Sequence, residues 1–163
     1  VTDMKNPMLL LLALVAFGCS NPEPTDLSTL VHQDGQYLDS ETMEPYSGVV
    51  ISFFGANPVT IAQSATLKNG YFDGPYQEYH QNGQLWLKGT YSAGQLDGPG
   101  ESYRESGELW SRGNFSHGKF DGSWEFYSEE GQLLDKGSFK NGEQCGEWME
   151  GGDTVTYDPC PSN

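Results

Sequence analysis

A twenty-four-residue unit repeats three times without a gap between Gly74 and Cys145. The copies read GPYQEYHQNGQLWLKGTYSAGQLD, GPGESYRESGELWSRGNFSHGKFD and GSWEFYSEEGQLLDKGSFKNGEQC. A fourth copy begins at Gly146 and loses the pattern after Trp148. Self-similarity at a fixed period indicates a repeat architecture in which each unit packs mainly on its neighbours. The chain is therefore expected to fold as a stack of similar units.

Glycines divide each unit into two short segments. They recur at alternating steps of thirteen and eleven residues, at Gly70, Gly83, Gly94, Gly107, Gly118, Gly131 and Gly142. Aromatic residues within short segments bounded by turn signals are typical of strands, and the glycines would weaken any helix spanning them. Each unit is therefore predicted to be a β-hairpin. The fold class is predicted to be all-β, an elongated antiparallel meander of repeated β-hairpins.

The two turns of a unit differ in what the sequence allows. At the first turn a three-residue loop with only glycine in the left-handed region suits all copies, because Glu130 would be strained at positive φ. That loop places Tyr79 opposite Leu85, Tyr103 opposite Leu109 and Tyr127 opposite Leu133. At the second turn the pairing of Tyr91 with Leu96 requires a two-residue loop, so both lengths stay open there.

The regular array, residues 74–145, is flanked by less regular segments. Residues 31–73 are predicted to form an irregular N-terminal β unit, whose first hairpin turns at Asp34-Gly35 and whose later turn is Ala56-Asn57-Pro58. Residues 146–163 are predicted to form a C-terminal cap with a last short strand over Thr154–Tyr157.

The first residues have the pattern of a targeting segment. Met8 to Phe17 is an apolar run too short to span a bilayer, typical of a secretory signal over residues 1–18. The run ends in Ala16-Phe17-Gly18-Cys19, which resembles the lipobox of bacterial lipoproteins. This resemblance implies a lipid on Cys19 and a place in the cell envelope, with the periplasmic side of the outer membrane favoured. An ordinary secretory signal is the alternative.

Residues 19–30 are rich in proline and small polar residues, and we expect them to be a flexible tether. Two cysteines lie beyond them, Cys145 and Cys160. In an oxidising compartment two thiols are expected to pair. Cys145 stands where Asp73, Asp97 and Asp121 stand in the other units, so the bridge would fasten the end of the array.

The charge of the chain limits its partners. A formal net charge of −15 argues against nucleic acid and against anionic lipid surfaces, since both attract basic proteins. Membrane contact is therefore expected through the N-terminal lipid alone. No metal-ligand spacing, P-loop or nucleophile elbow is present in the sequence. We expect neither catalytic activity nor a metal or cofactor, and interpret Asp73, Asp97 and Asp121 as turn formers that bond nearby amides.

Aromatic residues provide the candidate binding surface. Trp86 and Trp110 share a column that strand alternation places opposite the leucine column. They lie next to a basic column of Lys88, Arg112 and Lys136 in the sequence. Such tryptophans could stack on sugar rings or contact a partner protein. Alternatively, they cover the second face of the sheet.

From about Pro45 to Trp148 the recurring Asp-Gly, the aromatic residues, the Gly-x-Leu turns and the Lys-Gly pairs resemble the bacterial variant of the MORN repeat. Proteins with such repeats often carry the label of YwqK-type antitoxins of toxin–antitoxin pairs. The resemblance implies a β-hairpin array used as a scaffold or binding surface. Three functions are hypotheses: a lipid-anchored scaffold for a protein partner, a glycan-binding module that uses the tryptophan column, and an antitoxin, as the family label implies.

Overall fold

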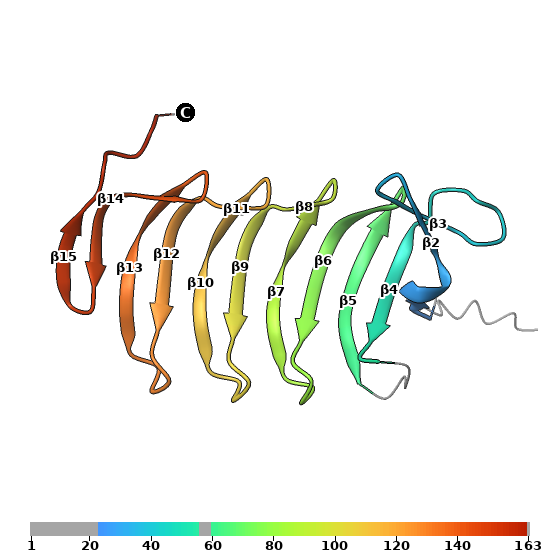
Figure 1. The fold of residues 1–163 in the computed structure, drawn as a ribbon, viewed down its shortest axis with the longest axis horizontal. Coiled ribbons are helices and arrows are strands. Elements are labelled where there is room, and N and C mark those ends of the chain that lie inside the picture. Colours follow the sequence, from blue (N-terminus) through green and yellow to red (C-terminus); the bar gives the residue numbers. More distant parts are fainter. Residues whose placement is uncertain (1–22, 56–59, 163) are drawn as a thin grey trace, which may run out of the picture.

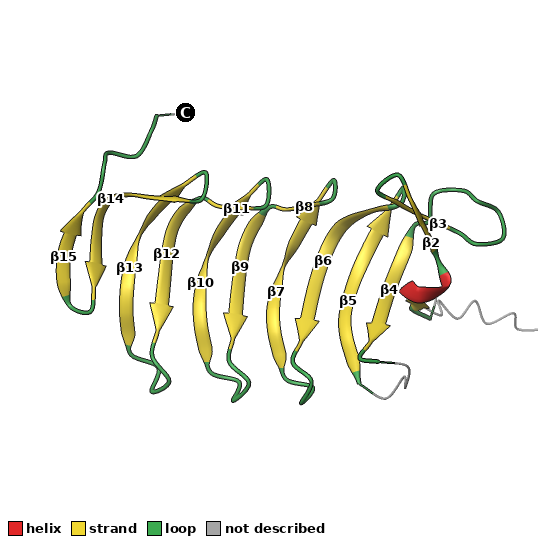
Figure 2. Ribbon diagram, viewed as in Figure 1, coloured by secondary structure: helices red, strands yellow, loops and turns green. Residues whose placement is uncertain are grey.

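The computed structural model describes residues 23–55 and 60–162. Within these ranges the chain forms one long sheet of thirteen strands and a separate two-stranded hairpin (Figures 1 and 2). The elements are β1 (Thr25–Asp26), the 3₁₀ helix η1 (Leu27–Thr29), β2 (Val31–Gln33), β3 (Gln36–Leu38), β4 (Gly48–Phe53), β5 (Ile61–Lys68), β6 (Tyr71–Tyr79), β7 (Leu85–Ser92), β8 (Gln95–Leu96), β9 (Gly98–Tyr103), β10 (Leu109–Ser116), β11 (Lys119–Phe120), β12 (Gly122–Tyr127), β13 (Leu133–Lys140), β14 (Glu143–Glu150) and β15 (Asp153–Thr156). The predicted all-β meander is confirmed.

From β4 onward the sheet is an antiparallel meander. Its order is β4-β5-β6-β7-β9-β10-β12-β13-β14-β15, with β8 on β7 and β11 on β10. The turns lie in two rims (Figure 1). We call the turns at Gly83, Gly107 and Gly131 the lower rim, and those at Gly70, Gly94, Gly118 and Gly142 the upper rim.

The two rims use different turns. In the lower rim the glycine alone has positive φ, as at Gly83, where the His80 amide donates to the Gln84 carbonyl. This is the predicted three-residue loop, and it pairs Tyr79 with Leu85. In the upper rim two consecutive residues have positive φ, with Ala93 at 47° and the next glycine at 84°. The upper turns are thus two-residue loops, and the strain expected at a non-glycine residue does not prevent them.

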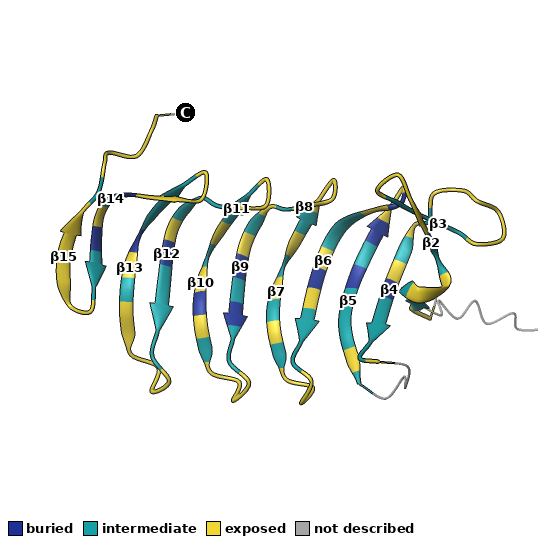
Figure 3. Ribbon diagram, viewed as in Figure 1, coloured by how far each residue is buried: buried dark blue, intermediate teal, exposed yellow. Residues whose placement is uncertain are grey.

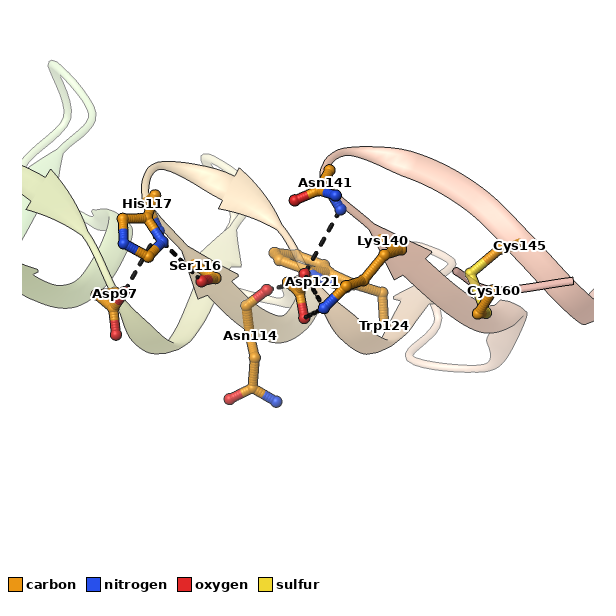
Figure 4. Close-up of polar contacts among 10 residues, drawn as sticks. All are labelled: Asp97, Asn114, Ser116, His117, Asp121, Trp124, Lys140, Asn141, Cys145 and Cys160. Atoms are coloured by element: carbon orange, nitrogen blue, oxygen red, sulfur yellow. Dashed lines mark hydrogen bonds and ion pairs between the residues drawn. A yellow bond between two sulfur atoms is a disulfide. The ribbon is translucent and has the colours of Figure 1, made fainter. Parts of the chain in front are cut away.

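Aspartate side chains hold the upper turns from the preceding unit. One oxygen of Asp97 accepts from the His117 amide at 3.3 Å, and one of Asp121 accepts from the Asn141 amide at 3.5 Å (Figure 4). The predicted bonds from these aspartate side chains to backbone amides are present, but the expectation that the amides are nearby in the sequence is wrong. The amide lies twenty residues further along the chain, because the sheet brings each turn back over the unit before it.

One face of the sheet carries the apolar core, which we call the inner face. Val50, Ala65 and Leu67 are buried near the N-terminal end, and Trp124 and Trp148 are 2% exposed near the C-terminal end. Burial follows narrow bands across the strands (Figure 3). The two clusters are separated by small residues, among them Ser102 and Ser111, whose hydroxyl oxygens lie 2.6 Å apart.

The predicted tether is shorter than expected. Residues 25 and 26 form β1, which pairs in parallel with β4, and Leu27 and Leu30 pack against the N-terminal core cluster. The assignment of residues 25–30 to a flexible segment is therefore wrong, because these two leucines bury apolar surface that anchors the chain. The hairpin at Asp34-Gly35 is present as predicted. The turn expected at residues 56–58 lies outside the described residues.

A disulfide fastens the C-terminal end. The sulfur atoms of Cys145 and Cys160 are bonded at 2.06 Å (Figure 4), as predicted from the cysteine count. The Gly146 amide donates to the Asp158 carbonyl at 2.8 Å, and the Tyr157 amide donates to the Gly146 carbonyl at 2.9 Å. The tail is thus tied to β14, whose other neighbours are β13 and β15. None of the helical structure in the described ranges is long and apolar enough to span a bilayer.

Candidate interaction surface

A ladder of ion pairs runs across the outer face of the sheet. Lys88 Nζ lies 2.6 Å from a Glu101 oxygen, Arg112 Nε lies 2.6 Å from a Glu125 oxygen, and Lys136 Nζ lies 3.0 Å from the other Glu125 oxygen. Strand register explains the pairing, because Lys88 is directly opposite Glu101 and Glu125 faces both Arg112 and Lys136. We call these five residues the charged ladder.

Two tyrosines at the ends of β9 and β12, next to the lower rim, bond to the acids of the charged ladder. The Tyr127 hydroxyl donates to Glu125 at 2.7 Å, and the Tyr103 hydroxyl donates to Glu101. The hydrogen bond from Tyr127 and the cations of Lys136 and Arg112 lower the pKa of the Glu125 carboxyl from 4.5 to about 2. All three stabilise the ionised carboxylate, so the ladder is charged at neutral pH.

The ladder changes the interpretation of the basic column. Lys88, Arg112 and Lys136 were predicted as candidate binding residues, and the structure places each of them in an ion pair within the chain. Their charges are already partly compensated, so they offer less to a ligand than the sequence suggests. Sequence reasoning did not single out Glu101 and Glu125. Their recurrence after twenty-four residues opposite the basic column is the signal that could have found them.

The tryptophans lie at irregularities of the sheet. Glu78 pairs with Leu87 and Tyr79 with Leu85, so Trp86 is an extra residue of the bulge type. Trp110 is the extra residue in the same place one unit later. The strand alternation that put the tryptophans beside the basic column is interrupted at both bulges. The sequence does not reveal these bulges, because the residues around each of them have the pattern of an uninterrupted strand.

Exposed apolar side chains follow these bulges along the array. Trp86 is 39% exposed, Trp110 45% and Leu134 41%, and they are spaced by one repeat. All three lie next to the lower rim, at the second position of β7, β10 and β13. We call them the apolar row. Single exposed apolar residues are common on protein surfaces, whereas a row of large ones repeated at a fixed spacing indicates a contact surface.

The remaining features of the sheet are its hollows, its possible metal ligands and the aspartates of the upper rim. Three shallow hollows of about 440, 400 and 260 Å³ lie along the described sheet. Within residues 23–55 and 60–162, no group of three or more histidine, cysteine or acidic side chains is placed to hold a metal ion. Asp73, Asp97 and Asp121 each serve a different turn of the upper rim.

Comparison with known families identifies two of the hairpins. Residues 72–93 and 120–141 match the model of the MORN repeat variant. They comprise most of β6 with β7, and β12 with β13. The hairpin between them has the same turns and register. MORN repeats are in general modules of protein or membrane interaction and are generally non-catalytic. No curated protein matches the chain.

The remaining candidate residues are placed as follows. Cys19, the predicted lipidation site, lies outside the described residues. Cys145 and Cys160 form the bridge at the C-terminal end and lie apart from the apolar row. The apolar row and the charged ladder are thus the two surface features that the repeats build along the array.

Proposed function

We propose that the protein is a non-enzymatic, lipid-anchored envelope protein whose MORN-type hairpin array is a scaffold for a protein partner. The observation that carries this proposal is the apolar row of Trp86, Trp110 and Leu134, exposed on the sheet at the spacing of the repeat. Buried tryptophan contributes heavily to protein–protein contacts. The side chains of the apolar row would therefore be buried against the partner, while the ion pairs of the charged ladder stabilise the outer face of the sheet.

Charge favours a particular kind of partner. At a formal net charge of −15, the chain attracts proteins with a basic surface and repels acidic ones. We expect the partner to bring apolar side chains against the row and basic side chains around it. Binding is then expected to weaken at high salt, because screening acts on the charges around the apolar contact.

The test of the row is a capture experiment with matched variants. Proteins of the cell envelope are passed over the intact chain, over Trp86→Ala/Trp110→Ala and over Tyr71→Ala, an aromatic residue exposed to a similar extent (41%) beside the upper rim. We expect one protein to be retained by the intact chain and by Tyr71→Ala, and not by Trp86→Ala/Trp110→Ala. Direct titration of that purified protein then gives the affinity. Equal retention by all three would contradict the proposed role of the row.

Glycan binding is the second candidate. Strands β7 and β10 are separated by β9, so Trp86 and Trp110 lie two strand spacings apart, about 10 Å. Exposed indole rings at such a spacing could stack on sugars of one chain. A glycan array distinguishes the two candidates. Saturable binding to one glycan, lost in Trp86→Ala/Trp110→Ala, would favour the second.

The lipid anchor has its own test. Radiolabelled palmitate is expected to label the native chain and not Cys19→Ala, because the Ala16-Phe17-Gly18-Cys19 segment resembles a lipobox. Equal labelling, or none, would remove the anchor from the proposal. Fractionation then separates the scaffold from the antitoxin hypothesis, since an antitoxin would be recovered from the cytoplasm.

A further inference from the structure

The C-terminal end of the inner face has a hollow that differs from the rest of the array. It has a volume of about 400 Å³, and its lining includes Phe126, Asp135, Phe139, Trp148, Glu150 and Tyr157. Trp148 is nearly buried and forms the floor, whereas the other five side chains are partly exposed. The hollow thus combines aromatic rings with two carboxylates.

The two carboxylates lie directly opposite each other. Asp135 of β13 is in register with Glu150 of β14. The equivalent pairs earlier in the array are Leu87 with Ser102, and Ser111 with Phe126. Like charges directly opposite on one face destabilise a sheet, so the acidic pair is a local departure from the repeat that costs stability when nothing lies between the acids.

Among the described residues, each carboxylate accepts a hydrogen bond through only one of its two oxygens. Asp135 accepts from the Gly151 amide at 3.0 Å through one oxygen, and Glu150 accepts from the Tyr157 hydroxyl at 2.7 Å through one oxygen. None of the four ion pairs within residues 23–55 and 60–162 includes either acid. The pair can therefore accept further hydrogen bonds from a cation.

The hollow lies where the last unit lacks a large apolar residue, because the column of Phe72, Leu96 and Phe120 continues as Gln144. In the preceding unit the Phe120 ring lies 3.9 Å from the Trp124 ring, centroid to centroid. The residue at the same place in the last unit is Gln144, which is exposed and lines the hollow. Among the described residues, the rings around Trp148 are those of Phe139 at 5.0 Å, Tyr157 at 6.3 Å and Phe126 at 6.4 Å, and none of them stands at the position of Phe120. The hollow therefore has both room for a small ligand and an apolar wall for it to contact.

We propose that this hollow binds a primary alkylammonium group, such as a lysine side chain or an aliphatic amine. The ammonium donates to the other oxygens of Asp135 and Glu150, which turns their repulsion into attraction for the ligand. Its alkyl chain lies against the rings of Phe126, Phe139 and Tyr157. This site is on the inner face, and it goes beyond the interaction of the apolar row.

The proposal is tested by titrating the native chain with n-pentylammonium, and with n-pentanol as the neutral analogue of the same length. Amide and indole resonances are followed by NMR. We expect n-pentylammonium to produce saturable shifts at Gly151 and at the Trp148 indole, and n-pentanol to bind at least tenfold more weakly. Asp135→Asn and Glu150→Gln keep the shape of each side chain and are each expected to weaken binding at least tenfold.

The matched control is Glu129→Gln, which removes one charge from an exposed acid outside the hollow. It is expected to bind n-pentylammonium as the native chain does. Three results would each overturn the proposal: no saturable shift with n-pentylammonium, equal affinity for n-pentanol, or the same loss in Glu129→Gln as in the two hollow variants. Circular dichroism of every variant establishes that a loss of binding is not a loss of fold. None of these outcomes depends on the apolar row.

Discussion

Trp124 lies so close over Gly113 that a Cβ atom on this glycine would be 2.3 Å from the Cδ2 atom of the indole. Trp148 covers Gly137 in the same way, with a corresponding distance of 2.1 Å. Both glycines lie in strands paired to the strand that carries the ring. Glycine therefore recurs inside the strands because an aromatic ring occupies the volume of its missing side chain.

Gly113→Ala is expected to destabilise the protein by about 2 kcal/mol or more, because the methyl group overlaps the Trp124 ring and forces it or the backbone to move. Chemical denaturation monitored by circular dichroism gives the free energy of unfolding. The control is Asn114→Ala on the exposed side of the same strand, which we expect to change that free energy by about 0.5 kcal/mol or less. Equal effects would contradict the close packing of ring on glycine.

Ala93→Gly is expected to stabilise the protein by about 1 kcal/mol. Ala93 has a φ of 47°, and alanine is strained in the left-handed region by about 1–2 kcal/mol, part of which is offset by the greater entropy of unfolded glycine. Ser92→Gly, at the neighbouring exposed strand position, is the control and is expected to lower stability. Thermal unfolding of the two variants should therefore shift in opposite directions from that of the native chain.

Stability is expected to fall on acidification through loss of the charged ladder. The pKa of Glu125 is lowered to about 2 in the folded protein from an ordinary 4.5, so the unfolded chain binds its proton first as pH decreases. The stabilisation by this carboxylate is complete above about pH 4.5 and is lost as pH falls towards 2. Urea denaturation at several pH values should show a smaller acid dependence in Glu125→Gln than in the native chain. An unchanged dependence would contradict the ladder.

Loss of the disulfide is expected to cost about 3 kcal/mol. The bridge between Cys145 and Cys160 closes a loop with a sequence separation of 15 residues, and cross-linking such a loop restricts the unfolded chain by about that amount. Cys160→Ser should therefore unfold at a lower temperature than the native chain. The native chain treated with a reductant should match the variant. If reduction leaves the unfolding temperature unchanged, the bridge does not support the fold.

The repeat period predicts much of this fold, because spacing alone fixes where glycines must turn the chain. The lower-rim loops and the pairing of Tyr79 with Leu85 follow from it. The upper rim was less predictable. The positive φ of Ala93 is supported by two hydrogen bonds: its own amide donates to the Asp73 carboxylate, and the Gly94 amide donates to the Phe72 carbonyl in the preceding strand. These contacts are distant in the sequence, so local propensity does not reveal them.

The features of the candidate interaction surface also differ in how far the local sequence predicts them. The exposure of Trp86 could be anticipated, but its place at a bulge could not, since the extra residue is defined only against the neighbouring strand. Pairing of Lys88 with Glu101 also needs the cross-strand register. Leu27 packs against the N-terminal core cluster. It lies outside the repeats, so the repeat pattern could not predict this contact.

Every upper turn is anchored to chain one unit earlier. The amides of Gly94, Gly118 and Gly142 donate to the carbonyls of Phe72, Leu96 and Phe120, each twenty-two residues before. Such a molecule can grow or shrink by duplicating or deleting whole hairpins, since every internal unit meets the same kind of neighbour on both sides. Deleting a single residue would instead shift the register of a strand, so that the turn amides would no longer lie opposite their carbonyl partners one unit earlier. The length of the sheet can thus change in evolution by one hairpin at a time, while the two specialised ends stay unchanged.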